Sequence, residues 1–396
     1  MFPILSRDES LLPHDHDRAL LIGRIWSEGA GPSVVRVTAN DVFDISALAA
    51  TCSDLLELPD PAGAVSAFDG SRVGSTADLL ANSDADLRKP ALPWFLAPCD
   101  LQAIKAAGVT FVASMLERVI EEQARGDATR AETVRRSVVA VIGDNLRNIR
   151  PGSPQAAQLR EVLIGQGVWS QYLEVGIGED AEIFTKAQPM SAVGMGAEIG
   201  LHPKSVWNNP EPEIVLAVNS RGQTVGCTLG NDVNLRDFEG RSALLLGKAK
   251  DNNASAAIGP FIRLFDTHFG IDDVRQSELT LRVTGANGFE MQGASSLAMI
   301  SRDPLDLVDQ AIGAPDCRTH QYPDGFMLYL GTMFAPTQDR HGPGQGFTHE
   351  LNDRVSVSTP RLGTLVNRVN YSNRIVPWTY GVTALMRDLS RRGLLA

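Results

Sequence analysis

The sequence has little of what would tie it to nucleic acid or to a membrane. Its 396 residues carry a formal net charge of −11, whereas nucleic acids and anionic membranes are bound by surfaces rich in lysine and arginine. The longest apolar runs are too short to span a bilayer, and the first residues lack a basic segment followed by an apolar one. We therefore expect no nucleic-acid partner, no membrane association and a location in the cytoplasm.

Cysteine is also scarce. The four cysteines, Cys52, Cys99, Cys227 and Cys317, lie far apart in the chain, and none forms a C-x-x-C pair. Scattered cysteines in a long chain are typical of reduced, buried thiols. The pattern indicates neither a disulfide framework nor a structural zinc site.

Hydrophobic patterning divides the chain into two parts. Short apolar runs alternate with polar breaks over residues 18–60, and we expect a small, strand-rich N-terminal α/β domain over residues 1–95. Residues 110–150 carry apolar side chains at helical spacing, which predicts a helix there. From about residue 210, strand patterns separated by turn residues dominate. Residues 96–396 are therefore expected to form a larger main domain with mixed α and β structure.

Two carboxylates stand at the entrance of one predicted strand. In NNPEPEIVLAV, Glu211 and Glu213 are two positions apart, so in a strand they share one face at a spacing of about 7 Å. A solvated strand entrance explains such a pair, and so does a divalent cation that neutralises both charges. The pair by itself fits either interpretation.

A third carboxylate follows at the end of the next predicted strand. Asp232 comes directly after Gly230 and Asn231, which favour a turn that could aim its side chain at the same face. Three carboxylates without histidine or cysteine are hard oxygen ligands, which suit Mg²⁺ or Mn²⁺. The sequence therefore predicts a divalent metal site at Glu211, Glu213 and Asp232.

Further candidates could bind an anionic substrate beside this metal. Lys250 and Arg236 are close in sequence to the acidic group, and Gly331 and Thr332 follow an apolar strand. Each of the two cations alone is more often an ordinary surface charge, and the Gly-Thr pair fits an ordinary turn equally well. Together they fit a site that holds a carboxylate.

These motifs, in this order, resemble the fumarylacetoacetate hydrolase superfamily over roughly residues 100–390. The matching features are the E-x-E at 211 and 213, the N-D-x-x-x-R-D at 231–237, Lys250 and the Gly331-Thr332 turn. The resemblance implies an α+β fold with a mixed β-roll core and assembly as homodimers or homotetramers. It also implies that the two glutamates and the aspartate hold Mg²⁺, which binds a small-molecule 2-keto acid.

One departure from the family pattern narrows the reaction. Hydrolases of this family carry a segment like G-x-N-Y-x-x-H-x-x-E, whereas GVTFVASMLE here has Ser114 in place of the histidine and keeps Glu117. A serine without a base cannot deprotonate water at neutral pH, so hydrolysis is in doubt. Glu239 is a second departure, because the hydrolases often have glutamine there. The chain is most similar to the sugar-acid dehydratases of the superfamily.

The resemblance implies dehydration of 2-keto-3-deoxy-D-xylonate, or of an epimeric 2-keto-3-deoxypentonate, to 2,5-dioxopentanoate in non-phosphorylative pentose oxidation. Glu117, with Ser114 on the same helix face, is the expected acid or base, and Lys250 either takes the C3 proton or pairs with the enolate. Arg236, Gly331 and Thr332 are the expected substrate-binding residues. Two alternatives stay open: a hydrolase of acylpyruvate-type diketo acids, and a non-catalytic metal-binding or ligand-binding module.

Overall fold

The computed structural model describes residues 3–5, 10–142, 149–334, 336–343 and 345–395. Two β-sheets form its centre. The larger sheet has the strand order β4-β3-β2-β1-β11-β10-β9-β14-β6-β7, and β5 pairs with β1. Its strands are β1 (Leu21–Ser27), β2 (Gly31–Val37), β3 (Asp41–Asp44), β4 (Ser71–Ser75), β5 (Trp94–Leu96), β6 (Ala103–Gly108), β7 (Glu182–Ala187), β9 (Pro212–Val218), β10 (Thr224–Asp232), β11 (Ala256–Leu264) and β14 (Phe326–Tyr329). Among these described strands, only β14 and β6 pair in parallel.

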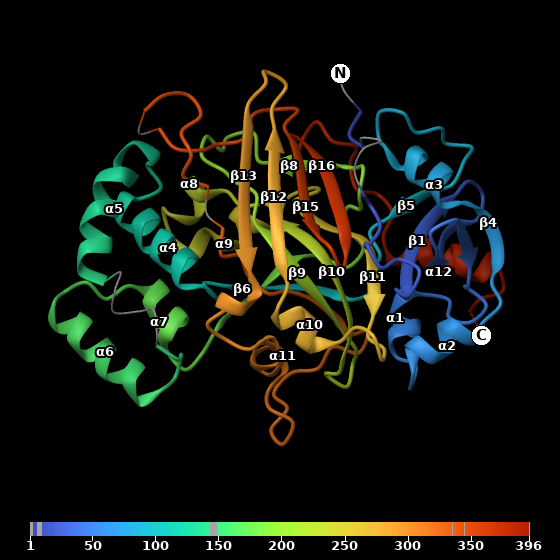
Figure 1. Cartoon of the computed structure of the whole chain (residues 1–396), viewed down its shortest axis with the longest axis horizontal. Helices are drawn as coiled ribbons and strands as arrows, with labels where there is room; N and C mark the ends of the chain where they lie inside the picture. Colours follow the sequence, from blue (N-terminus) through green and yellow to red (C-terminus); the bar gives the residue numbers. More distant parts are fainter. Residues whose placement is uncertain (1–2, 6–9, 143–148, 335, 344, 396) are drawn as a thin grey trace.

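A smaller sheet packs against the centre of the larger one, and Figure 1 shows it in front of β9, β10 and β11. Its order is β13 (Glu290–Ser296), β12 (Glu278–Thr284), β15 (Arg354–Thr359), β16 (Gly363–Tyr371) and β8 (Glu198–Leu201). In β12, buried Leu279, Leu281 and Val283 alternate with exposed residues, so one face of this strand packs on the core and the other faces solvent.

The central strand β9 is buried at every position because both of its faces are covered. Ile214 and Leu216 point into the core that the two sheets share, whereas Val215 and Ala217 point into a second core on the opposite face. Glu213 has the same parity as Val215 and therefore belongs to this second face. A carboxylate in such a strand is shielded from bulk water by the fold itself.

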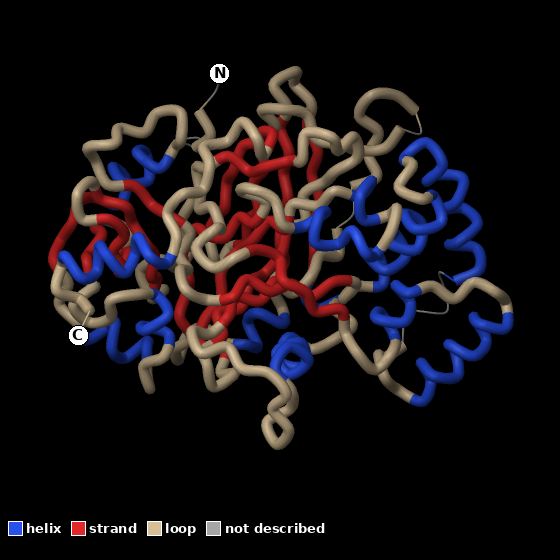
Figure 2. The backbone as a smooth tube through the Cα atoms, turned by 180° about the vertical axis from the view of Figure 1, so that it is seen from behind, coloured by secondary structure: helices blue, strands red, loops and turns tan. Residues whose placement is uncertain are grey.

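Most helices gather at the two ends of the sheets, whereas those labelled α10 and α11 lie below the centre of the sheets in Figure 1 (Figures 1 and 2). They are α1 (Cys52–Leu56), α2 (Pro61–Ala67), α3 (Thr76–Ser83), α4 (Val112–Ala124), α5 (Ala128–Ile142), α6 (Pro154–Gly165), α7 (Gln171–Ile177), α8 (Arg236–Glu239), α9 (Leu246–Lys250), α10 (Ile271–Arg275), α11 (Pro304–Ile312) and α12 (Val382–Arg391), with short 3₁₀ turns η1 (Ala243–Leu245) and η2 (Leu297–Met299). Within the described ranges, none of them combines the length and the apolar character that crossing a bilayer requires.

The helical stretch predicted over residues 110–150 is two helices, so the prediction of one helix is wrong. Helix α4 ends because Arg125 and Gly126 adopt left-handed conformations, with φ of 55° and 70°. Helix α5 then begins at Ala128 and packs against α4. Residues 143–148 of the predicted stretch lie outside the described residues.

The expected boundary at residue 95 falls inside a strand of the larger sheet. Strand β5 spans the boundary and pairs with β1, and β1 in turn pairs with β11 through Leu21 opposite Arg263. Residues 1–95 therefore share a continuous sheet with the rest of the chain. The division into two domains stays a prediction.

Candidate active site

Three carboxylates from two neighbouring strands meet in one buried place. Glu213 lies in β9, Glu211 precedes that strand, and Asp232 ends β10. The Glu211 amide donates to Asn231 Oδ1 at 3.0 Å, and the Asp232 amide donates to the Glu211 carbonyl at 3.0 Å, which fixes both backbones. One oxygen atom from each carboxylate lies within 4.8 Å of the other two. The structure thus brings the three predicted metal ligands together.

Three cations surround this group. The Lys250 Nζ atom at the end of α9 lies 2.6 Å from Glu211 Oε2 and 3.0 Å from Asp232 Oδ2. Lys186 of β7 is fully buried, and its Nζ lies 2.7 Å from Asp232 Oδ1. Arg118 of α4 donates to Glu211 Oε1 at 2.6 Å. The sequence predicted Lys250, whereas Lys186 and Arg118 reach the site through contacts between elements far apart in the chain.

Glu213 differs from its two neighbours in its partners. Its Oε2 accepts from the Gly331 amide at 2.6 Å, and among the described residues it forms no ion pair. Burial raises the pKa of Glu213 well above its usual value, and the nearby charges of Asp232 and Glu211 raise it further. A divalent cation would remove this repulsion, and an all-oxygen donor set suits one. The residues present therefore fit a metal such as Mg²⁺.

The turn after β14 holds this carboxylate rather than offering a free amide. Gly331 has a φ of 89°, and a Cβ there would lie 2.0 Å from Thr110 Oγ1, so the turn that presents this amide to Glu213 requires glycine. Because the Gly331 amide already donates to Glu213, it is not available to a substrate carboxylate as the sequence suggested. Thr332 beside it lines the cavity.

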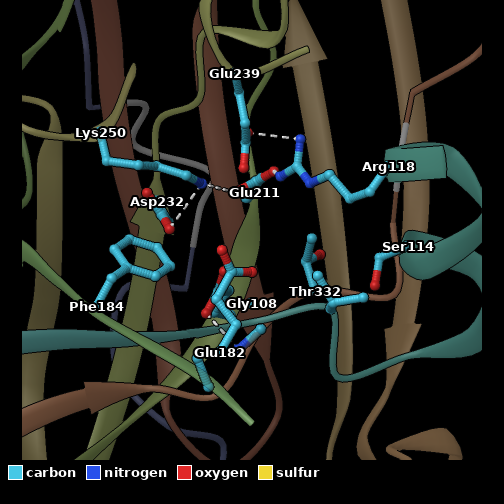
Figure 3. A pocket seen from close by; sticks show the side chains of 14 residues that line it. Gly108, Ser114, Arg118, Glu182, Phe184, Glu211, Asp232, Glu239, Lys250 and Thr332 are labelled. Carbon is cyan, nitrogen blue, oxygen red and sulfur yellow. Dashed lines mark hydrogen bonds and ion pairs between the residues drawn. The ribbon is translucent and has the colours of Figure 1, made fainter. Parts of the chain in front are cut away.

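A small cavity opens beside the three carboxylates, and Figure 3 shows its lining. Strands β6, β7, β9 and β10, helices α4, α8 and α9, and the turn after β14 contribute to it. The lining residues are Ala107, Gly108, Val109, Ser114, Arg118, Glu182, Phe184, Glu211, Glu213, Asp232, Glu239, Lys250, Gly331 and Thr332. Of the candidates named from the sequence, the three carboxylates, Lys250, Ser114, Gly331 and Thr332 meet here.

Glu117 and Arg236 lie outside this lining. Glu117 accepts from Arg135 Nη2 at 2.6 Å and from Arg236 Nη2 at 3.0 Å. Arg236 also donates to Glu121 at 2.6 Å and stacks on the ring of Trp207. The structure therefore does not bring these two predicted residues to the cavity. For Glu117 helix geometry explains this, because a change of one residue turns a side chain by about 100° around the axis of α4.

Ser114 and Arg118, which are four residues apart on α4, both line the cavity. The Ser114 hydroxyl donates to the Phe111 carbonyl at 3.0 Å. Arg118, which directly follows Glu117, therefore faces the carboxylates. Its charge was visible in the sequence, but the orientation of the helix that carries it was not.

Two acidic residues of the cavity were not among the site residues predicted from the sequence. Glu182 is the first residue of β7, opposite Gly108 of β6, and burial raises its pKa. Glu239 ends α8, and burial raises its pKa to about 7 against the opposing effect of Arg118, whose Nη1 lies 2.8 Å from Glu239 Oε2. The departure from the family glutamine was a signal for Glu239. Glu182 had none, because a glutamate at a strand start is common on exposed sheets.

Comparison with known proteins first shows the fold of the chain. The chain matches no family model. A solved fumarylacetoacetate hydrolase from psychrophilic Exiguobacterium antarcticum aligns over 89% of this chain and all of its own, with a TM-score of 0.51 and 15% identity. The chain therefore has the α+β fold of the fumarylacetoacetate hydrolases, as its motifs predicted.

More particular similarities are to sugar-acid dehydratases. A structure described as "2-keto-3-deoxy-D-arabinonate dehydratase complexed with magnesium and 2,5-dioxopentanoate" aligns over 89% of this chain and 99% of its own, with a TM-score of 0.61 and 19% identity. The "2-dehydro-3-deoxy-D-arabinonate dehydratase" of Saccharolobus solfataricus is 29% identical over 49% of this chain and 60% of its own length. The "Probable 2-keto-3-deoxyxylonate dehydratase" of Haloferax volcanii is 29% identical over 50% of this chain and 63% of its own. The chain thus spans about three fifths of the length of these curated relatives.

Proposed function

We propose that this chain is a metal-dependent hydro-lyase that removes water from a 2-keto-3-deoxypentonate and releases 2,5-dioxopentanoate. The observation that carries the proposal is the buried cavity in which three ligand carboxylates lie beside Lys250 and Glu182. The names of the two relatives and of the similar structure support it. The proposed substrate is 2-keto-3-deoxy-D-xylonate or an epimer, and the proposed setting is non-phosphorylative pentose oxidation.

Glu211, Glu213 and Asp232 are the proposed ligands of Mg²⁺, with Mn²⁺ as an alternative. Bound there, such an ion would supply Lewis-acid stabilisation of the negative charge that develops on the 2-oxo group of the substrate. Gly331 and Lys250 orient the carboxylates: the Gly331 amide fixes Glu213, and Lys250 bridges Glu211 and Asp232. Fixed ligands keep the substrate end in one place.

Lys250 is assigned the role of a permanent cation. Burial acts to lower its pKa, but Asp232, Glu211 and Glu239 outweigh burial and raise it. The Lys250 ammonium donates to both Glu211 and Asp232, and an ammonium has no lone pair with which to accept a proton. Of the two roles that the sequence left open, we therefore propose that Lys250 pairs with the enolate oxygen and that another group takes the C3 proton.

Glu182 is the proposed carrier of that proton. It lines the cavity, and burial raises its pKa, which brings a carboxyl closer to the range in which it can both accept and release a proton. The C3–H and C4–O bonds break, a C3–C4 double bond forms, and Glu182 passes the C3 proton to the hydroxyl, which leaves as water. Tautomerisation of the remaining 5-hydroxy enone gives the C5 aldehyde.

Dehydration is favoured over hydrolysis by the composition of the cavity. Its described lining residues include no histidine, and Ser114 stands where the resembling hydrolases carry one. Without that histidine, the residue pair that activates water in the resembling hydrolases is incomplete. The hydroxyls of Ser114 and Thr332 are instead suited to hydrogen-bond the hydroxyl groups of a sugar acid.

The test is incubation of the purified protein and Mg²⁺ with each 2-keto-3-deoxypentonate epimer, with detection of 2,5-dioxopentanoate. We expect turnover of at least one epimer, and none after chelation. Cleavage of an acylpyruvate without any dehydration would favour the hydrolase instead. Absence of both reactions in metal-loaded protein would favour a non-catalytic binding module.

The cytoplasmic location expected from the apolar runs and the first residues, and the assembly as a homodimer or homotetramer that the resemblance implies, are part of the same proposal. Apolar side chains around α12 support a self-association surface: Val376 is 82% exposed, and Trp378, Val382 and Met386 are also exposed. Light scattering of the purified chain measures the assembly, and a monomeric mass would contradict it.

A further inference from the structure

Acidic side chains outnumber basic ones in the lining of the cavity. Five carboxylates line it, namely the three ligands with Glu182 and Glu239, against two cations, Arg118 and Lys250. Lys186, which pairs with Asp232 from outside the lining, offsets one of the three excess negative charges. A divalent metal would offset the other two, and the carboxylate of a 2-keto acid would add one again. The cavity therefore stays negative when it is loaded, which disfavours any further anion.

Both cations of the lining are already engaged. Arg118 Nη1 lies 2.8 Å from both Glu121 Oε2 and Glu239 Oε2, and Nη2 lies 2.6 Å from Glu211. The Lys250 ammonium bridges Glu211 and Asp232. Among the described residues that line the cavity, no cation is left to pair with a second carboxylate of a ligand. An unpaired charge buried there would keep its full desolvation cost.

Glu239 lines the cavity without being one of the three proposed metal ligands, so it is free to contact the part of a ligand that the metal does not hold. It is 3% exposed, and Arg118 holds one of its oxygens. Figure 3 shows Glu239 and Glu182 reaching into the cavity from opposite sides, with Glu211 between them. A carboxylate held in this way accepts hydrogen bonds from hydroxyl groups and repels other carboxylates.

We propose that Glu239 is a specificity-determining residue, which accepts a hydrogen bond from a distal hydroxyl of a monocarboxylic 2-keto acid and excludes 2-keto acids with a second, distal carboxylate. The inference rests on the proposed function for the metal-bound 2-keto acid end of the ligand. It goes beyond that function by assigning selection at the other end to one side chain.

The test compares two ligands of equal chain length that cannot lose water from C4. Calorimetric titration of the Mg²⁺-loaded full chain uses 5-hydroxy-2-oxopentanoate and 2-oxoglutarate, which differ in a distal hydroxyl or carboxylate. We expect the hydroxy acid to bind about 10-fold or more tightly than the diacid. Its hydroxyl donates a charge-assisted hydrogen bond to Glu239, whereas the second carboxylate of the diacid meets a like charge there. Glu239→Gln, which keeps the shape, should reduce this ratio about 10-fold.

Glu122→Gln is the matched control. Glu122 lies on α4, but its carboxylate binds Ser170 and Gln171 and does not line the cavity. This variant should keep the wild-type ratio, and thermal melting of both variants shows that they are folded.

The inference is overturned if the wild-type chain binds the two acids equally, a result that needs no variant. It is also overturned if Glu239→Gln leaves the ratio unchanged, or if neither acid binds the metal-loaded chain. The predicted ratio without turnover of any 2-keto-3-deoxypentonate would uphold the inference and reject the proposed reaction. The two claims therefore fail under different results.

Discussion

At the scale of single residues, two equally buried carboxylates of the site have opposite pKa shifts because only one of them has ionic partners among the described residues. Asp232 and Glu213 are both 2% exposed. Burial acts to raise the pKa of Asp232, but Lys186 and Lys250 together lower it. For Glu213, burial, Asp232 and Glu211 all raise the pKa. The two carboxylates should therefore respond in opposite ways when each is replaced by its neutral isostere.

We expect Glu213→Gln to stabilise the metal-free chain by about 1 kcal/mol, because folding then no longer has to overcome the burial and repulsion that raise the pKa of Glu213. Asp232→Asn should destabilise it by about 3 kcal/mol, because Lys186 then stays buried without its partner. Both variants should lose Mg²⁺ binding and activity, whereas Mg²⁺ restores activity to the chelated wild type. Urea unfolding of the metal-free proteins and Mg²⁺ titration measure these effects. Equal destabilisation by both variants would contradict the charge assignment.

The proton carrier is tested by a pair of matched variants. Glu182→Gln should reduce kcat about 10²-fold or more, since it keeps the shape of the side chain and removes the titrating proton. Glu117→Gln should leave kcat within a few-fold, because Glu117 pairs with Arg135 and Arg236 away from the cavity. Its cost should appear as lost stability of roughly 1 to 3 kcal/mol.

Steady-state kinetics and metal analysis of both variants decide the assignment. Each should hold the wild-type amount of Mg²⁺, since neither carboxylate is a proposed ligand. A large loss of kcat in Glu117→Gln with near-normal turnover in Glu182→Gln would return the role to Glu117, as the sequence first suggested.

The sequence could predict the site wherever local geometry determines the answer. Glu211 and Glu213 share a strand face through the two-residue period. The turn predicted at Gly230 and Asn231 is wrong, because β10 continues through both residues to Asp232. Asp232 meets the two glutamates because β10 pairs with β9. That Arg118 rather than Glu117 lines the cavity depends on how α4 is rotated about its own axis, which the sequence does not determine. Glu182 depended on the pairing of β7 with β6, which is a contact between distant segments.

At the scale of elements, a buried ion pair anchors the start of β15. Asp353 accepts from Arg340 at 2.6 and 2.7 Å and lies 3.0 Å from His349 Nδ1. Arg340 also stacks on the ring of Phe289. Burial acts to raise the pKa of Asp353, but the hydrogen bonds from Arg340 and His349 outweigh it and lower the pKa. The pair joins the segment after Gly331 to the smaller sheet.

We expect Asp353→Asn to cost about 2 kcal/mol of unfolding free energy at neutral pH, because buried Arg340 loses its buried partner and keeps Glu350, which is partly exposed and 3.3 Å away. The pKa of Asp353 is lower in the folded chain than its unfolded value of 3.8. Its ion pair therefore contributes its full stability above the unfolded pKa, and this stability is lost as the pH falls through the folded pKa. The difference between wild type and variant should therefore be constant above about pH 5 and shrink below pH 4. Urea unfolding across this range measures it, and a difference independent of pH would contradict the assignment.

At the scale of the whole molecule, one sheet joins the two parts that the sequence separated. The local patterns predicted strands over residues 18–60 and from about residue 210. The pairing of β1 with β11, however, links residues more than 200 positions apart, for which periodicity gives no signal. Side chains strengthen the connection. Arg263 of β11 is fully buried and donates to both carboxylate oxygens of Asp15 at 2.8 Å.

The two parts should therefore unfold together, although they were predicted as separate domains. Removing residues 1–95 would expose the edge of β11 and leave Arg263 without Asp15, and an unpaired strand edge favours aggregation. We expect a single calorimetric transition for the whole chain and no cooperative melting for a chain that begins at residue 96. Asp15→Asn, which weakens the connection without removing a strand, should lower the temperature of that single transition rather than split it. Two resolved transitions, or a well-folded chain from residue 96, would instead establish two independent domains.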